Sequence, residues 1–589
     1  MKKVLCFVLM VSLGAFAGDS KLSNDLKKLR GDHTVDVIVQ YKTSPGERHK
    51  DRISRHLGKV GSELRLVRGI RASIPLRQLR DLSDDPEVSH ISPDHNVGAS
   101  LIYSTTAAGA SYAWNSGYDG TGIGVAVIDS GISMSSDLEA QGSNTSRVVY
   151  SQNFVAGSNT TADLYGHGTH IAGMIAGNGA QSACGNCFNP IKGMAHTANL
   201  INLRVLDDTG HGQDSWVIAA LDRAIQLKEQ YNIRVINLSL GRPVYESYAD
   251  DPLCQAVERA WNAGMVVVVA AGNDGRNNSA GTEGYGTINA PANDPYVLTV
   301  GAMKAQDTLS TADDTIASYS SKGPTIIDTI AKPDLVAAGN RVVSLADSAG
   351  YLYANFSENR VPLSYYMTGA PSGSDSTAYY RQSGTSMAAA IASGAVADLL
   401  EAQPSLTPDQ VKARLMKTAR KTFPLFSSVY DPATGQTYTS QYDVFTIGAG
   451  YLDLSAALID TDVATLPAKS PSAYYDSAGN SFHLIFDNGA LWGSGALWGS
   501  TAVWGDHNFV NDNGALWGSG ALWGSGALWG SGALWGSGAL WGSGALWGSG
   551  AVGGNGALWG SGALWGSGAL WGSGAAAGEG TAVLVKGEN

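Results

Sequence analysis

Three polar side chains, far apart in the sequence, could together carry out acyl transfer. Asp129 ends the stretch GVAVID, His167 lies in GHGTH, and Ser386 lies in GTSMA. Acyl transfer through a serine requires a hydroxyl as nucleophile, an imidazole that takes its proton, and a carboxylate that holds the imidazole in one tautomer. Each short motif alone is more often a turn or a helix cap. The presence of all three, each within two residues of a glycine, favours catalysis.

The segments between these residues predict an α/β domain with a doubly wound, mostly parallel sheet. Short apolar runs, typical of strands buried on both faces, occur at residues 125–128, 200–206, 235–240, 266–270 and 297–300. Helix-length stretches separate them, such as residues 215–231 and 251–263. Reactive groups gather at the carboxyl ends of the strands in such sheets, and Asp129 directly follows the first run.

A predicted helix start is expected to stabilise negative charge beside Ser386. Residues 389–400 are rich in helix formers, so Ser386 lies near a helix N-terminus. Its backbone amide and the helix dipole can then face a developing oxyanion. Asn273 follows the most apolar strand, and its side-chain amide is the candidate second donor.

Nine motifs in order resemble the catalytic domain of the subtilisin-like serine proteases, the subtilase family. They are GVAVIDSGI, GHGTHIAG, INLRVLDDTGHG, NLSLG, VVAAGND, PANDPYVLTVGA, YSSKGPT with KPDLVAAG, GTSMAAA and GAGYLDLSAAL, within residues 120–458. The resemblance implies a serine endopeptidase domain at residues 98–458. It also implies that Asp129 orients His167, that His167 is general base and then acid, and that Ser386 is the nucleophile. Asn273 and the Ser386 amide would form the oxyanion hole.

The same resemblance implies where a protein or peptide substrate binds. Two segments would hold the substrate between them as an added β-strand, and a third would line the primary specificity pocket. The strand-binding positions are Gly210, His211, Gly212, Ser239, Leu240 and Gly241, and the pocket positions are Ala270, Ala271 and Gly272. Asp274 is placed at the pocket rim, where it would either favour a basic or polar substrate residue or be a solvated carboxylate.

The N-terminal part predicts export and self-processing. Residues 1–17 combine two lysines, an apolar stretch and Ala-Phe-Ala, the pattern of a secretory signal peptide. We therefore expect a secreted protein, extracellular or periplasmic and cell-surface associated, without a transmembrane segment. Residues 18–97 contain a βαββαβ pattern that resembles a subtilase propeptide, which assists folding and then inhibits the enzyme. Self-cleavage is expected between Asp94 and Thr106.

Charge is unevenly distributed, which argues against nucleic acid as a partner. Residues 18–97 carry 15 Lys and Arg against 12 Asp and Glu, whereas the whole chain carries 39 against 51. An acidic body repels phosphates, and a basic unit ahead of it allows electrostatic attraction between the two.

Three cysteines follow the predicted signal peptide, in a compartment that permits disulfides. Cys184 and Cys187 are predicted to form a local disulfide, with free thiols as the alternative, and Cys254 is expected to be a small buried residue. No cofactor is expected to be required for catalysis. Subtilases commonly bind structural calcium, so calcium is a candidate ligand, but no ligand loop is evident and the metal ligands stay unassigned.

Several positions depart from the subtilase pattern or need a separate interpretation. Ala390 stands where the family usually has proline, and Ile391 begins IASG where it usually has HVAG. Both changes are compatible with a helix, so altered packing is expected with little effect on catalysis. His170 is expected to be structural. Residues 339–382 are longer than a minimal subtilase needs, and the stretch SENRVPLSYYMTGAPSGSDS within them, residues 357–376, is a candidate insertion near the substrate cleft.

The hexad GALWGS recurs across residues 489–573, after a predicted linker at 459–488 and before a tail at 574–589. Two glycines per hexad disfavour a helix, and the even period suits a strand. Three interpretations stay open: stacked strands or a β-solenoid, a tryptophan platform for cell-surface glycans, and a low-complexity tether that self-associates. The alternative function is a surface-binding or structural repeat protein whose protease domain serves only to mature it.

Overall fold

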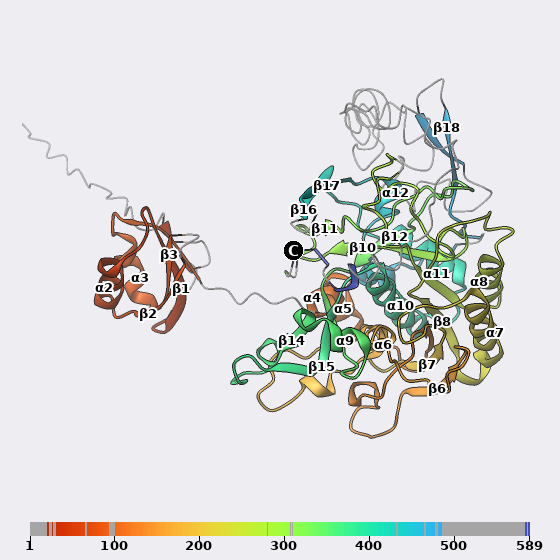
Figure 1. Cartoon of the computed structure of the whole chain (residues 1–589), viewed down its shortest axis with the longest axis horizontal. Coiled ribbons are helices and arrows are strands. Elements are labelled where there is room, and N and C mark those ends of the chain that lie inside the picture. The colour runs from red at the N-terminus through yellow and green to blue at the C-terminus, as the bar shows by residue number, and fades with distance from the viewer. Residues whose placement is uncertain are drawn as a thin grey trace, which may run out of the picture. The chain divides into compact units, whose positions relative to one another are not determined.

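The computed structural model describes residues 21–22, 26–27, 31–64, 68–93, 101–279, 281–306, 308, 310–431, 434–464, 467–476, 481–485, 583–585 and 587–588. The chain divides into two compact units, Met1–Gly98 and Ala99–Asn589, which are described separately (Figure 1). Within the described parts of the chain, no helix has the length and apolar character needed to cross a membrane.

The N-terminal unit is a four-stranded antiparallel sheet with two helices. Its elements are β1 (Thr34–Tyr41), α2 (Glu47–Arg55), β2 (Lys59–Leu64), β3 (Gly69–Pro75), α3 (Leu76–Ser83) and β4 (Val88–Pro93), with strand order β2-β3-β1-β4. Alternating residues of β1, such as Val37 and Val39, are buried against Ile53 of α2 and Leu79 of α3 in one small core. The order of elements is the predicted βαββαβ order.

The larger unit is built on a central sheet whose inner strands are buried on both faces, whereas the edge strand at residues 148–153 is partly exposed. Its strands are β5 (Gly124–Asp129), β6 (Val148–Asn153), β7 (Asn199–Arg204), β8 (Ile233–Leu238), β9 (Val266–Ala270), β10 (Leu298–Lys304), β11 (Thr315–Ile316) and β12 (Leu335–Ala338). The order is β11-β10-β9-β8-β5-β7-β6, with β12 also paired to β10. Every pair is parallel except β10 with β11. The predicted α/β class is confirmed.

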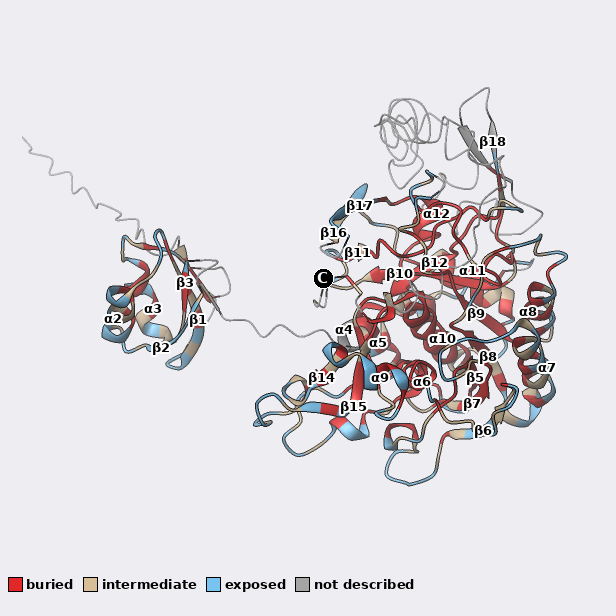
Figure 2. Cartoon of the chain, in the orientation of Figure 1, coloured by how far each residue is buried: buried red, intermediate tan, exposed pale blue. Residues whose placement is uncertain are grey.

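Helices cover the sheet, and their sequences fit their positions. The main ones are α6 (Gly168–Ala176), α7 (Asp214–Tyr231), α8 (Pro252–Asn262), α10 (Thr385–Ala402) and α11 (Pro408–Thr418). α8 starts where the Asp251 side chain caps the Leu253 N–H (2.9 Å) and proline occupies the first turn. α7 and α8 leave one face exposed, whereas α10 is buried almost throughout (Figure 2).

Small residues let α10 approach its neighbours closely. The sequence of α10 is TSMAAAIASGAVADLLEA, and it packs across β8, β9, β10 and β12. Ala390 and Ile391, the two departures from the family pattern, are fully buried within this unbroken helix. At Gly394, a Cβ atom would lie 2.4 Å from the Cβ of Met194, so hydrogen is the side chain that fits.

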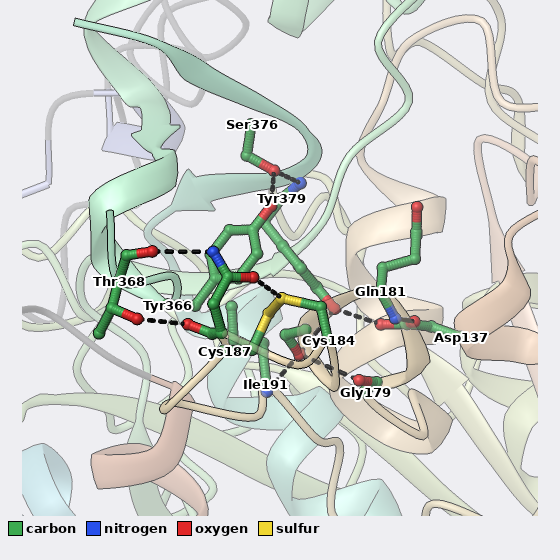
Figure 3. The surroundings of a disulfide bond; sticks show 12 residues. Asp137, Gly179, Gln181, Cys184, Cys187, Ile191, Tyr366, Thr368, Ser376 and Tyr379 are labelled. Carbon is green, nitrogen blue, oxygen red and sulfur yellow. Dashed lines mark hydrogen bonds between the residues drawn. A yellow bond between two sulfur atoms is a disulfide. The ribbon is translucent and has the colours of Figure 1, made fainter. Parts of the chain in front are cut away.

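Residues 342–382 form a separate arm that packs on the Cys184–Cys187 loop. Its elements are β13 (Val342–Leu345), α9 (Tyr351–Asn355), β14 (Arg360–Pro362) and β15 (Asp375–Gln382), with antiparallel order β13-β15-β14. Cys184 and Cys187 are joined in a disulfide, and the Thr368 N–H donates to the carbonyl of Asn186 between them (2.8 Å; Figure 3). The Tyr379 hydroxyl donates to buried Asp137 (2.7 Å).

Shorter elements complete the larger unit. They are α4 (Leu101–Ala107), α5 (Ala110–Asn115), β16 (Phe426–Asp431), β17 (Gln436–Gln441), α12 (Val444–Ile447), α13 (Leu454–Ile459), β18 (Ser472–Asp476) and β19 (Ser481–Ile485). β16 pairs with β17 and β18 with β19, each antiparallel.

The segment expected to be a linker, residues 459–488, differs from that prediction over much of its length. Ser470 is buried, where it accepts from the Lys412 ammonium (2.9 Å) and donates to Asp334. The Ala473 N–H donates to the Thr329 carbonyl (2.7 Å). The segment packs here because the fully buried Lys412–Asp334 pair requires polar partners. The predicted signal peptide and the GALWGS hexads lie outside the described residues.

The close contact at Gly394 gives a stability prediction. Replacing a mid-helix glycine by alanine ordinarily stabilises by about 1 kcal/mol. Because the new methyl group would meet Met194, we expect Gly394→Ala instead to lower the free energy of unfolding by about 1–3 kcal/mol in thermal or urea unfolding. Gly185→Ala is the matched control, since its Cβ would meet nothing within 4 Å. Equal stability of the two variants would contradict the packing described for α10.

Candidate active site

Asp129 is placed at the carboxyl end of β5, in the middle of the sheet. β5 has the sequence GVAVID with every residue buried, so the carboxylate at its end is removed from water. Its Oδ1 accepts hydrogen bonds from the Ser130 N–H (2.7 Å) and the His167 Nδ1 (2.7 Å). These donors compensate the burial of a negative charge.

His167 lies at the N-terminus of α6, with its ring against Asp129. The side chain is only 4% exposed. Because the carboxylate accepts from Nδ1, the proton is on Nδ1 and Nε2 carries the free lone pair, which is the arrangement that a general base needs. Gly168 allows this approach, since a Cβ there would lie 2.2 Å from the Gly131 carbonyl oxygen.

A second buried carboxylate, Asp163, ties the Asp129 loop to the His167 helix. Asp163 accepts from the Ser130 hydroxyl, the Gly166 N–H and the Thr169 N–H, each at 2.7 Å. Burial raises the pKa of Asp163, and these hydrogen bonds partly oppose the rise. The sequence analysis did not identify Asp163. The signal that could have identified Asp163 is that an aspartate lies four residues before His167.

Ser386 lies in the first turn of α10 and lines the same cleft as His167. Its hydroxyl donates to the Ser239 carbonyl (3.2 Å), and the Ser239 hydroxyl donates to the Ser386 carbonyl (3.0 Å). Among the described residues the Ser386 hydroxyl makes no hydrogen bond to His167. Hydrogen bonds between reacting groups are often formed only when substrate is bound, so this geometry is compatible with proton transfer between them.

Asn273 presents its amide group to the cleft. Its Oδ1 accepts from the Thr385 N–H (2.9 Å) and the Thr385 hydroxyl (3.2 Å). Because the carbonyl side of the amide is occupied, Nδ2 remains as the donor on the side of Ser386. Two residues brought together by β9 and α10, Asn273 and Ser386, thus provide the donor types that an oxyanion hole uses.

The cleft walls contain almost all the predicted substrate-binding positions. The residues at the cleft surface include Gly210, His211, Gly212, Ser239, Leu240, Gly241, Ala270 and Gly272. Ala271 is fully buried and is not among the described lining residues, because alternate residues at the end of β9 face opposite sides of the sheet. Asp274 also lines the cleft and accepts from the Asn289 amide (3.2 Å).

Helix α9, just before the candidate insertion, lies at one edge of the cleft. Tyr165, a lining residue, stacks on Tyr351 of α9 with ring centroids 6.0 Å apart. The Leu352 N–H donates to the Tyr165 carbonyl (3.0 Å). α9 ends just before residues 357–376. That those residues are an insertion near the cleft stays a prediction.

The remaining candidate groups are structural. His170 is buried behind His167, where its Nε2 contacts the Val342 carbonyl (3.2 Å), and burial lowers its pKa to about 3. Cys254 is buried with its thiol toward Asn293 (3.3 Å), and burial raises its pKa. In the described part of the chain, no three His, Cys, Asp or Glu side chains are grouped as metal ligands.

Known proteins resemble this chain in sequence. Residues 120–450 match the model of the Subtilase family. Serine protease AprX of Bacillus subtilis (strain 168) is 36% identical over 341 residues, which cover 57% of this chain and 70% of AprX. Subtilisin E of the same strain is 32% identical over 375 residues, 63% of this chain and 80% of that protein. Subtilisin of Bacillus pumilus is 33% identical over 322 residues, 54% and 92% respectively.

The ion pair between His167 and Asp129 leads to a prediction of how turnover depends on pH. Burial lowers the pKa of His167, but the Asp129 carboxylate more than offsets burial, so the net shift is upward from 6.5. A general base must be neutral, and a raised pKa keeps His167 protonated to higher pH. We therefore expect the acid limb of kcat/KM on a chromogenic peptide to have its midpoint above pH 6.5.

The variant Asp129→Asn provides the control for this prediction. Removing the carboxylate should move the acid limb to lower pH and reduce kcat by about 10⁴-fold. An acid limb that stays in the same place in Asp129→Asn would show that the ion pair does not set the pKa of His167.

Proposed function

The chain belongs to the subtilase family and is a serine endopeptidase, and from that premise we propose that Asp129, His167 and Ser386 are its catalytic triad. The observation that carries the proposal is the buried 2.7 Å contact between His167 Nδ1 and Asp129, on a cleft that Ser386 also lines. The contact fixes the tautomer that leaves Nε2 free to accept a proton. This is the property that separates a catalytic histidine from the structural His170.

The reaction proceeds in two acyl-transfer steps. The Ser386 hydroxyl turns from the Ser239 carbonyl to His167, gives its proton to Nε2, and attacks the substrate carbonyl carbon. The oxyanion that forms is stabilised by Asn273 Nδ2 and the Ser386 N–H. His167 then protonates the leaving amine, and an acyl-enzyme forms on Ser386. Water, deprotonated by His167, hydrolyses this ester and regenerates the hydroxyl.

The substrate is an extended stretch of polypeptide. Residues 210–212 and 239–241 are on the cleft surface, where two separate backbone segments support binding of a peptide as an added strand. Ala270 and Gly272 line the pocket for the side chain that precedes the cleaved bond. Asp274 at the cleft surface supports a preference for a basic or polar residue there.

Maturation removes the N-terminal unit. The unit Met1–Gly98 has a core of its own, and its boundary falls within the predicted cleavage region between Asp94 and Thr106. The unit has its own hydrophobic core and is joined to the rest of the chain by one covalent connection. These features support a detachable propeptide, residues 18–97, that inhibits the enzyme until the connection is cut. The residue pattern at 1–17 supports secretion.

The remaining parts of the proposal concern ligands and the repeat. Triad chemistry uses the chain's own side chains and needs no cofactor, and structural calcium stays a prediction from the family resemblance. The GALWGS hexad contains no ionisable side chain that could activate its serine, so the hexads would locate the enzyme, by binding glycans or by self-association, and take no part in catalysis.

One comparison tests the triad and the self-processing together. Purified unaltered protein should lose an N-terminal piece of roughly 80 residues in intact mass, and it should digest casein. Ser386→Ala should do neither. The control Ser393→Ala replaces a serine two turns further along α10 and should retain both activities.

Each contrary result has a definite meaning. If Ser386→Ala matures and digests casein equally well, Ser386 is not the nucleophile. If the unaltered protein sheds its N-terminal piece but does not digest casein, the protease serves only self-maturation, and the binding-protein alternative is correct.

A further inference from the structure

The last described residues, 583–585 and 587–588, lie on the surface of the larger unit (Figure 1), and we call them the C-terminal segment. Its backbone is held at both ends. The Ser383 N–H donates to the Leu584 carbonyl (3.0 Å). Asn340 exchanges two hydrogen bonds with the backbone of Glu588: it accepts from the N–H (2.8 Å) and donates to the carbonyl (2.9 Å). These contacts resemble those of a bound peptide.

The side chain of Glu588 is fully buried in a polar pocket. Its Oε1 accepts from the Arg276 guanidinium (2.9 Å) and the Ser318 N–H (2.7 Å), and from the Ser318 hydroxyl. An unpaired buried carboxylate would be strongly unfavourable, so the pocket must supply charge and donors together. The other oxygen, Oε2, has no partner among the described residues.

Arg276 is held in position by the protein independently of Glu588. Its Nε donates to the Ser318 hydroxyl (2.8 Å), its Nη1 pairs with Asp431 (3.1 Å), and its guanidinium lies 4.8 Å from the ring centre of Tyr438. These contacts leave Nη2 for the Glu588 carboxylate. A preorganised cation of this kind is typical of a binding site for an anionic group.

The residue before Glu588 also matches the site. Gly587 has φ +57, and a Cβ there would lie 2.3 Å from the Ser383 hydroxyl oxygen and 2.9 Å from Asn340 Oδ1. A glycine is therefore required where the segment passes between these side chains. The same Gly-Glu pair occurs earlier in the chain, at residues 578 and 579, which provides a matched control.

The segment reaches the catalytic cleft. Leu584 lines the cleft that also contains His167, Asn273 and Ser386. Ser383, which binds the Leu584 carbonyl, lies only three residues before Ser386 in the chain. A substrate that extends to this end of the cleft would meet Leu584.

We propose that the C-terminal segment is an intramolecular ligand of the peptidase domain. The Arg276–Ser318–Asn340 pocket binds its Gly-Glu sequence, and Leu584 competes with substrate for one end of the catalytic cleft. The competition rests on the function proposed above, whereas the binding of the segment does not. Since β19 is also part of the larger unit, the hexad repeat is then connected to the same domain at both of its ends.

The binding can be tested without catalysis, by hydrogen–deuterium exchange of full-length Ser386→Ala protein. Peptides covering residues 583–588 should exchange slowly in this protein and in its Glu579→Ala derivative. In the Glu588→Ala derivative they should exchange about ten-fold faster or more, because the anchor is lost. Glu588→Gln, which keeps the side chain's shape, should give an intermediate rate. Equal and rapid exchange in all four proteins would overturn the proposed binding.

The competition is tested in the active enzyme with a long peptide substrate. Glu588→Ala should lower KM several-fold with kcat unchanged, because the cleft no longer has to be vacated, and Glu579→Ala should leave both constants unchanged. Release of the segment in the exchange experiment without a change in KM would overturn the competition alone. If the active enzyme hydrolyses no peptide, the proposed function fails, and the exchange experiment still decides whether the segment binds.

Discussion

The proposed active site depends on keeping a carboxylate and an imidazole together at a point from which water is excluded. Asp129 and His167 come from different elements, β5 and α6, and both are buried. The one hydrogen bond between Asp129 and His167 would not keep β5 and α6 in a fixed relative position. Ser130 and Asp163 make the connection rigid, because the Ser130 hydroxyl donates to Asp163 and accepts from the Gly168 N–H at 2.9 Å. The histidine is thus oriented by a network of which its own hydrogen bond is one part.

The position of Ser386, the proposed nucleophile, depends on a different physical constraint, the close packing of α10 against the sheet. Because α10 is rich in alanine, glycine and serine, its backbone approaches β8 and β9 closely, and its first turn comes beside Ser239 and Asn273. The helix start then supplies a free N–H and a favourable dipole in the place where negative charge develops. Large side chains in α10 would increase the spacing and move Ser386 away from the donors that it needs.

The sequence predicted those features that arise from local pattern. Apolar runs identified the strands. Glycine-containing motifs at one strand end and two helix starts identified the proposed catalytic residues Asp129, His167 and Ser386. The features that were missed depend on contacts between distant residues. Ser470 packs because Lys412 and Asp334 are buried together, and no pattern near Ser470 indicates this. The binding of Glu588 similarly depends on Arg276, 312 positions earlier.

The stretch that contains the hexad repeat is joined to β19 on one side and to the C-terminal segment on the other, and this affects how tightly the segment is bound. While the chain is intact, the segment is tethered to its own site, so its local concentration does not depend on how dilute the protein is. A single cut anywhere between β19 and the segment would convert this intramolecular equilibrium into a bimolecular one. Dilution of the cut protein would then separate the peptide from its pocket, and proteolysis of the connecting chain would act as an irreversible release.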